Sequence, residues 1–155
     1  MKKKYTTTKH QEMQHIIRLY KEETGETEVD MHKVAEYAVI KGWPLGKPAD
    51  PFDLLATEFA RAAREETKID EISGQPYRVN HAYQIGQMTF WIDIDEAPRE
   101  PMKKSLVARR EQMVGDGLQL TLDADHWNSI HPGEEPIQMH LDFTEDVQWR
   151  IMGLE

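Results

Sequence analysis

The feature that most constrains this chain is a pair of strand-like runs separated by only two residues. Residues 77–85 and 88–95 alternate apolar with polar side chains, and Gly86-Gln87 lies between them. A two-residue connection with glycine first is typical of a tight β-hairpin and fixes which residues face each other. The resulting register sorts side chains by polarity, which supports the hairpin. The predicted pairs are Tyr83–Phe90, His81–Ile92 and Val79–Ile94 on one face, and Gln84–Thr89, Ala82–Trp91, Asn80–Asp93 and Arg78–Asp95 on the other.

Three helices are predicted before this hairpin. The first spans about residues 8–23, and the second follows Asp30, a good N-cap, and stops at Gly42. The third follows Asp50 as N-cap, and Pro51 takes its first position, where a missing N–H costs nothing. One side of this third helix is apolar and is predicted to form a buried stripe of Phe52, Leu55, Phe59 and Ala62.

A fourth helix is predicted to begin near residues 100–101. Gly115-Asp116-Gly117 either ends it, so that residues 118–122 form a strand, or lies inside a continuous helix to about Asn128. We favour the continuous helix, because a glycine inside a helix costs only about 1 kcal/mol. An extended segment over residues 135–143 follows, and then a short last helix capped by Thr144.

Three helices followed by a β-hairpin is the element order of a winged helix, which residues 1–97 therefore resemble in architecture. The expected fold is α+β in one domain, 1–155: three winged-helix-like helices plus the hairpin, then, in residues 98–155, a further helix and an extended acidic C-terminal segment. The resemblance carries no family motif. One departure is the connection of about eight residues between the second and third helices, since the helix-turn-helix of this class is usually tighter.

The charge of the chain is unevenly distributed. The net charge is −9, and residues 123–155 carry eight acidic side chains against Arg150 alone, which is −7 of that total. An acidic whole-chain balance therefore does not exclude a local basic surface. The chain has no cysteine and no long apolar run, so we expect a cytoplasmic protein that does not enter a membrane.

Opposite its apolar side, the third helix is predicted to carry a polar and basic row, which consists of Thr57, Arg61, Arg64 and Lys68. If this helix acts as a recognition helix, the row would contact duplex DNA, with Arg78 on the wing and the Lys2-Lys3-Lys4 arm adding affinity. The plainer interpretation is a solvated helix face whose charge is reduced by Glu58 and Glu65. The candidate nucleic-acid-binding residues are Thr57, Arg61, Arg64, Lys68 and Arg78.

The C-terminal segment is a candidate partner-binding surface. Residues 134–150 combine acidic side chains with alternating apolar ones, a pattern suited to strand addition on a partner protein. Packing on its own domain is equally compatible, and the acidic tail could also lie over the basic row. The candidate anchors are Ile137, Met139, Leu141, Phe143 and Trp149.

No residue pattern predicts catalysis, a metal site, a cofactor or a small-molecule substrate. The acidic and histidine side chains near the C-terminus match no metal-binding motif, and a predicted cross-strand partner accounts for each of Asp93 and Asp95. The leading hypothesis is a non-enzymatic nucleic-acid-associated or regulatory protein. The second is a protein–protein adaptor or accessory subunit, and the third a metal-dependent hydrolase. The metal-type residues considered are Asp123, Asp125, His126, His131, His140 and Asp142.

Overall fold

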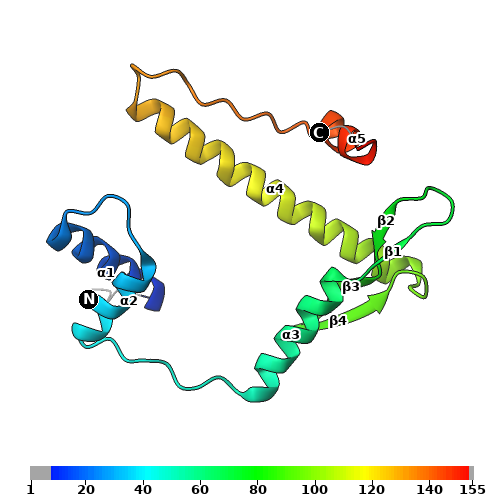
Figure 1. The fold of residues 1–155 in the computed structure, drawn as a ribbon, viewed down its shortest axis with the longest axis horizontal. Helices are drawn as coiled ribbons and strands as arrows, with labels where there is room; N and C mark the ends of the chain where they lie inside the picture. Colours follow the sequence, from blue (N-terminus) through cyan, green and yellow to red (C-terminus); the bar gives the residue numbers. More distant parts are fainter. Residues whose placement is uncertain (1–7, 154–155) are drawn as a thin grey trace, which may run out of the picture. The chain divides into compact units, whose positions relative to one another are not determined.

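The computed structural model describes residues 8–153, so the Lys2-Lys3-Lys4 arm lies outside the described residues. The mixed α+β class is confirmed, with helices first, then short strands, then a long helix (Figure 1). The chain divides into two compact units, with the boundary between Asp50 and Pro51. This boundary falls inside the winged-helix-like part, and the organisation as one domain stays a prediction. Within the described residues, no helix combines the length and apolarity needed to cross a bilayer.

The first unit contains two helices, α1 (Lys9–Thr24) and α2 (Met31–Ile40), as predicted. A capping box begins α1: the Thr8 side chain accepts from the Gln11 backbone N–H, and the Gln11 side chain accepts from the Thr8 N–H. Asp30 caps α2 by accepting from the His32 backbone N–H at 2.8 Å. The two helices pack through an edge-to-face contact of Tyr20 and Tyr37, with ring centroids 5.5 Å apart.

The second unit begins with α3 (Pro51–Glu65). This helix ends before Lys68, the last residue of the predicted basic row. The chain leaves the helix at Glu66 and forms a short strand, β1 (Thr67–Ile69), that the sequence did not predict. Lys68 therefore lies on β1 and does not share a helix face with Arg61 and Arg64, so that part of the prediction is wrong.

The predicted strand over residues 77–85 is divided in two at Val79. Its first part is β2 (Pro76–Arg78), which pairs with β1, and its second part is β3 (Asn80–Ile85). Arg78 consequently faces Thr67 and not Asp95, which corrects one predicted pair. Val79, only 2% exposed, connects the two small sheets: its N–H donates to the Glu66 carbonyl, and its own carbonyl accepts from the Ile94 N–H.

The second hairpin, β3 with β4 (Met88–Asp93), has the predicted register from Asn80–Asp93 to Gln84–Thr89. At its turn Gly86 has a φ of +61°. Every residue with a positive φ in the described part of the chain is a glycine. A positive φ at the first turn residue alone is the type II′ geometry, which matches the right-handed twist of the strands.

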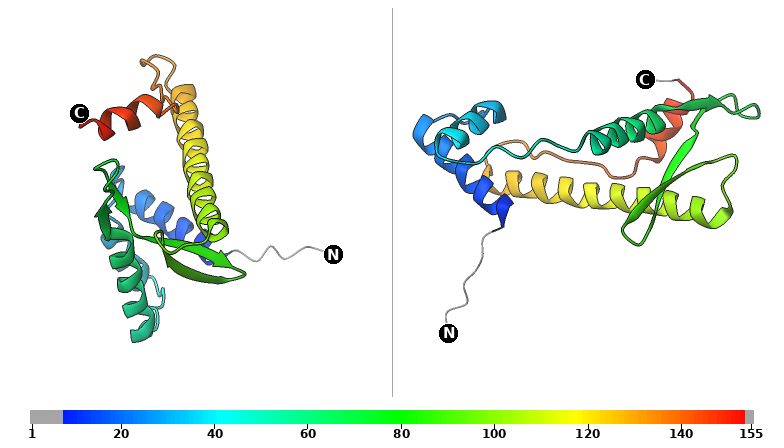
Figure 2. Two further views of the ribbon diagram at one scale, coloured as in Figure 1. Left: turned by 90° about the vertical axis from the view of Figure 1, so that its right-hand side faces the viewer. Right: turned by 90° about the horizontal axis from the view of Figure 1, so that it is seen from below.

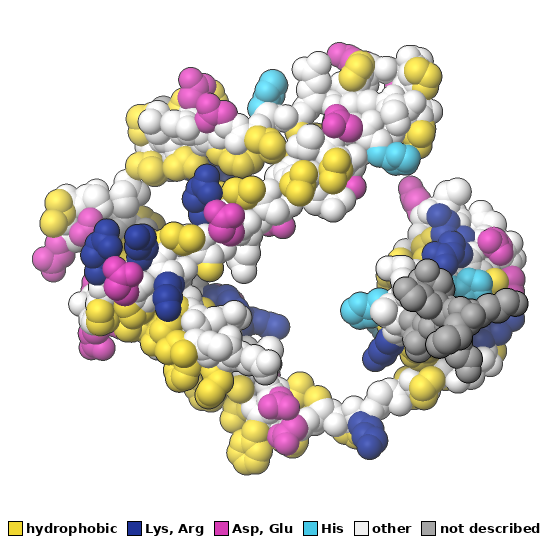
Figure 3. Space-filling view, turned by 180° about the vertical axis from the view of Figure 1, so that it is seen from behind, with side chains coloured by type: hydrophobic (Ala, Val, Ile, Leu, Met, Phe, Trp, Pro, Cys, Tyr) yellow, Lys and Arg dark blue, Asp and Glu magenta, His cyan; other side chains and the backbone are white. Residues whose placement is uncertain are grey.

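The apolar side of α3 is exposed within this chain, contrary to the predicted buried stripe. Phe52, Leu55 and Phe59 are 82%, 49% and 69% exposed, and Ala62 is exposed as well. Figure 3 shows hydrophobic side chains gathered along this helix. Sequence periodicity identified the apolar side correctly but does not determine whether the same chain covers it.

A single helix, α4 (Arg99–Ile130), follows the hairpin and confirms the continuous alternative over a strand at residues 118–122. Its first turns pack on β3 through Ser105, which is buried. Beyond a turn after His131, the extended segment runs back along α4 and ends in α5 (Thr144–Ile151), as the views of Figure 2 show. Thr144 is the first residue of α5 and not its cap, which is Phe143.

Two contacts hold the extended segment on α4. The Asn128 side chain donates to the Ile137 carbonyl and accepts from the Ile137 N–H, both at 2.9 Å. Nearer the start of α4, the Leu141 side chain lies over Gly117, and its methyl carbons are 3.7 Å from where a Cβ of residue 117 would stand. The segment forms no strand pairing among the described residues, so within this chain it packs on its own unit.

Gly117→Ala is expected to raise the free energy of unfolding by about 1 kcal/mol, because alanine favours helix and its methyl group would meet Leu141 at an ordinary contact distance. Gly115→Ala, in open space, should give the same gain, whereas Gly86→Ala should destabilise because of the positive φ. Chemical denaturation followed by circular dichroism measures all three. A loss of stability in Gly117→Ala alone would contradict the described packing of Leu141.

Candidate nucleic-acid interface

A basic groove lies between the end of α3, the β3–β4 hairpin and the first turns of α4. Its volume is about 440 Å³, within the range of ligand-binding clefts. Its lining contains no Asp or Glu side chain. Its four cationic side chains come from three elements, Arg64 from α3, Arg78 from β2, and Lys104 and Arg109 from α4.

Arg64 is placed by the last turns of α3. Its guanidinium carbon lies over the Trp91 ring on β4, 5.1 Å from the centroid, in cation–π geometry. Asn80 ties this helix end to β3, because its side-chain amide donates to the Ala63 carbonyl at 3.2 Å and to the Glu66 carboxylate at 2.7 Å. The helix end, and with it Arg64, is therefore fixed against the hairpin.

Arg78 is placed by the bend between β2 and β3. The buried His81 ring donates its Nε2 hydrogen to the Arg78 carbonyl at 2.9 Å, so this histidine supports the backbone that carries Arg78. His81 lies on the face that the register predicts to be apolar, and its ring is buried and hydrogen-bonded. The bond also explains why a polar side chain is tolerated on the apolar face of the hairpin.

Lys104 and Arg109 are placed by the helical repeat of α4. Ser105, Ala108 and Gln112 are spaced i, i+3 and i+7 and line the groove along one side of the helix. Lys104 and Arg109 flank this stripe, one on each side, and their side chains reach the groove as well. Sequence reasoning missed both residues, because only the packing of α4 on β3 brings them near Arg64.

None of the four cations forms an ion pair with a residue that the structure describes. In the part of the chain that the structure describes, the ion pairs are Lys33–Glu26, Lys41–Glu23, Lys68–Asp95, Arg99–Glu100 and Arg110–Glu111. No described carboxylate of the acidic C-terminal segment pairs with a groove cation, or with Arg61. The groove therefore combines four positive charges that have no ion-pair partner among the described residues.

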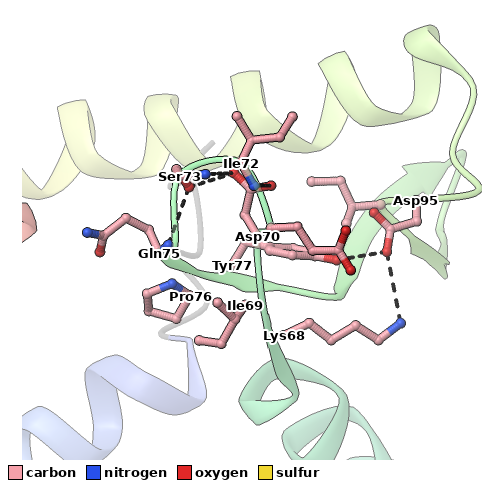
Figure 4. A pocket seen from close by; sticks show the side chains of 11 residues that line it. Lys68, Ile69, Asp70, Ile72, Ser73, Gln75, Pro76, Tyr77 and Asp95 are labelled. Carbon is pink, nitrogen blue, oxygen red and sulfur yellow. Dashed lines mark hydrogen bonds and ion pairs between the residues drawn. The ribbon is translucent and has the colours of Figure 1, made fainter.

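The other residues predicted to bind nucleic acid lie elsewhere. The Thr57 hydroxyl donates to the Asp53 carbonyl at 2.9 Å, and Arg61 is exposed on α3 without lining the groove. Lys68 lies beside Asp95, with Nζ 3.9 Å from the carboxylate, and the Tyr77 hydroxyl donates to that same carboxylate at 2.9 Å (Figure 4). This hydrogen bond is the main cause that raises the pKa of Tyr77, and desolvation of the hydroxyl is the second.

The predicted partner-binding residues lie along α4 and on α5. Ile137, Met139, Leu141 and Phe143 remain about half exposed where the segment follows α4. Trp149 is also about half exposed, on the α5 helix. No group of three or more His, Asp or Glu side chains within residues 8–153 is close enough together to hold a metal ion.

Comparison of the chain with protein-family models, with curated proteins and with solved structures finds no match.

Proposed function

We propose that this chain is a non-enzymatic nucleic-acid-binding protein and that the basic groove holds the phosphate backbone. The observation that carries the proposal is the convergence of Arg64, Arg78, Lys104 and Arg109 on one groove that no carboxylate lines. Phosphate contacts with lysine and arginine supply most of the sequence-independent affinity of nucleic-acid-binding proteins.

The form of the groove favours a single strand over a duplex. Duplex recognition in a winged helix depends on a row of side chains along one helix, and here Lys68 has left that helix. The groove instead combines cations with the aromatic rings of Tyr83 and Trp91, the combination that single-strand binding proteins use for backbone and base contacts. Its polar lining, which includes Asn80 and Gln112, adds hydrogen-bonding groups.

The experiment is a fluorescence anisotropy titration with a 20-nucleotide single strand and a duplex of equal length, at about 25 to 200 mM salt. Four phosphate contacts to a single strand give an expected slope of log affinity against log salt of about −3. Lys104→Ala with Arg109→Ala should reduce this slope to about −1.5, because two of the four contacts are lost. Absence of binding at about 50 mM salt, or an unchanged slope in the double variant, would refute the proposal.

The adaptor hypothesis has a separate supporting observation. The C-terminal anchors Leu141, Phe143 and Trp149 keep about half of their surface exposed, although the extended segment already rests on α4. A partner would therefore bind the outer side of this segment and not a free strand edge. Phe143→Asp with Trp149→Asp should abolish capture of such a partner and leave binding in the groove unchanged.

A further inference from the structure

The chain exposes more surface than compact packing of its two units explains. Its accessible surface is 14140 Å². Two compact bodies of the sizes of the two units would expose roughly 10,000 Å². The difference of about 4,000 Å² exceeds the roughly 1,000 to 2,500 Å² that each chain of an obligate dimer buries. A large interface between chains would therefore fit this chain well.

One apolar stripe of α4 is especially suited to such an interface. Val107, Val114 and Leu118 are 48%, 51% and 61% exposed, although all three are aliphatic. Their spacings of seven and four residues place them on one side of the helix, in the 3.5-residue repeat of paired helices. The extended segment covers the neighbouring side of α4, where Gly117 and Asn128 lie, and leaves the stripe half exposed.

The charges of α4 specify what can pair with it. Residues 99–110 carry five basic side chains against Glu100, and residues 111–130 carry four acidic side chains and no Lys or Arg. A second α4 running antiparallel would place each basic half beside an acidic half. A parallel copy would bring like charges together along the whole helix. The basic residues are Arg99, Lys103, Lys104, Arg109 and Arg110, and the acidic ones are Glu111, Asp116, Asp123 and Asp125.

We propose that α4 forms an antiparallel pair with the α4 of a second copy of this chain, around a two-fold axis near residues 112–113. In this register Val107 of each copy lies opposite Leu118 of the other, and Val114 lies opposite Glu111, whose carboxylate pairs with Arg110 of its own helix. Isologous contacts of this kind are the commonest basis of homodimers. The stripe and the groove occupy different sides of α4, so the pairing stands independently of the nucleic-acid proposal.

The mass of the intact chain in solution tests the pairing. Sedimentation at about 50 µM should give a dimer, twice the 18.1 kDa of one chain. Val114→Glu with Leu118→Glu should give a monomer with unchanged helix content, because both side chains are exposed in the single chain. Ile72→Glu is the matched control. Ile72 is almost fully exposed in the turn between β1 and β2, outside α4, so this variant should remain dimeric. A monomeric wild type, or a dimeric double variant, would overturn the proposal.

Cross-linking tests the direction of the pairing. The natural chain has no cysteine, so a single introduced cysteine reports only its own position. Val114→Cys lies near the proposed axis and should form an intermolecular disulfide on mild oxidation. Arg99→Cys should not, because antiparallel pairing separates the two copies of this position by roughly 40 Å at 1.5 Å per residue. An intermolecular disulfide at position 99, or none at position 114, would overturn the antiparallel arrangement.

Discussion

Replacing Arg64 with glutamate is expected to weaken single-strand binding by roughly tenfold or more at low salt, whereas replacing Arg61 with glutamate should change it less than about threefold. Both arginines lie on α3, three residues apart, but only Arg64 lines the groove and covers the Trp91 ring. A charge reversal at Arg64 removes a phosphate contact and places a carboxylate among three remaining cations. At Arg61 the reversed charge removes no groove contact and only lowers the local positive potential.

Anisotropy titrations of the two variants at about 50 mM salt measure this difference, with circular dichroism as the check that each variant folds. Arg64→Lys separates charge from stacking: it should retain much of the salt dependence while losing the planar contact with Trp91. Equal losses in Arg61→Glu and Arg64→Glu would place binding on the outer face of α3, as the basic row predicted. A full loss in Arg61→Glu alone would exclude the groove.

The hairpin was predictable because one short turn determines it. Gly86-Gln87 allows a two-residue connection, and the alternation of polarity on both sides leaves one register that sorts the side chains. Five predicted pairs are therefore present, and Tyr83 and Phe90 lie with their ring centroids 6.0 Å apart. The continuous α4 was predictable in the same local terms, since its two glycines cost less than ending the helix would.

The first hairpin was not predictable from local pattern. Strand β1 has three residues and all three are exposed, so no alternation of buried and exposed side chains marks it. Its pairing with β2 takes Arg78 away from Asp95, which the Tyr77 hydroxyl and Lys68 contact instead. A bend at one residue, Val79, thus gave Arg78 a different partner from the predicted one.

The groove depends on packing between elements that are distant in the sequence. Arg64 and Arg78 were identified as basic residues near a helix end and a strand, but Lys104 and Arg109 belong to a helix whose orientation on β3 the sequence does not determine. The amphipathic pattern of α3 likewise identifies an apolar side but does not determine what packs against that side. Side-chain chemistry was therefore predictable from the sequence, and side-chain neighbourhood was not.

Val79→Asp is expected to disrupt both hairpins of the second unit. Val79 is the most buried apolar side chain in the described chain, and its backbone joins the β1–β2 pair to the β3–β4 pair. A carboxylate at this position would be buried without a described cation against it, which costs several kcal/mol and outweighs what a small core supplies. Val79→Ala removes only apolar contacts and should cost about 2 kcal/mol of unfolding free energy.

Hydrogen exchange at the Val79 and Ile94 amides measures the effect directly, because these two N–H groups form the bonds that join the sheets. Both should lose protection in Val79→Asp and keep most of it in Val79→Ala. Ile72→Asp, at an almost fully exposed position of the first hairpin, is the control and should leave both amides protected. Groove binding should disappear together with that protection, since Asn80 and His81, the two residues that follow Val79, hold the α3 end that carries Arg64 and the Arg78 carbonyl. Val79→Asp with wild-type protection at both amides would show that this residue is not the joint between the sheets.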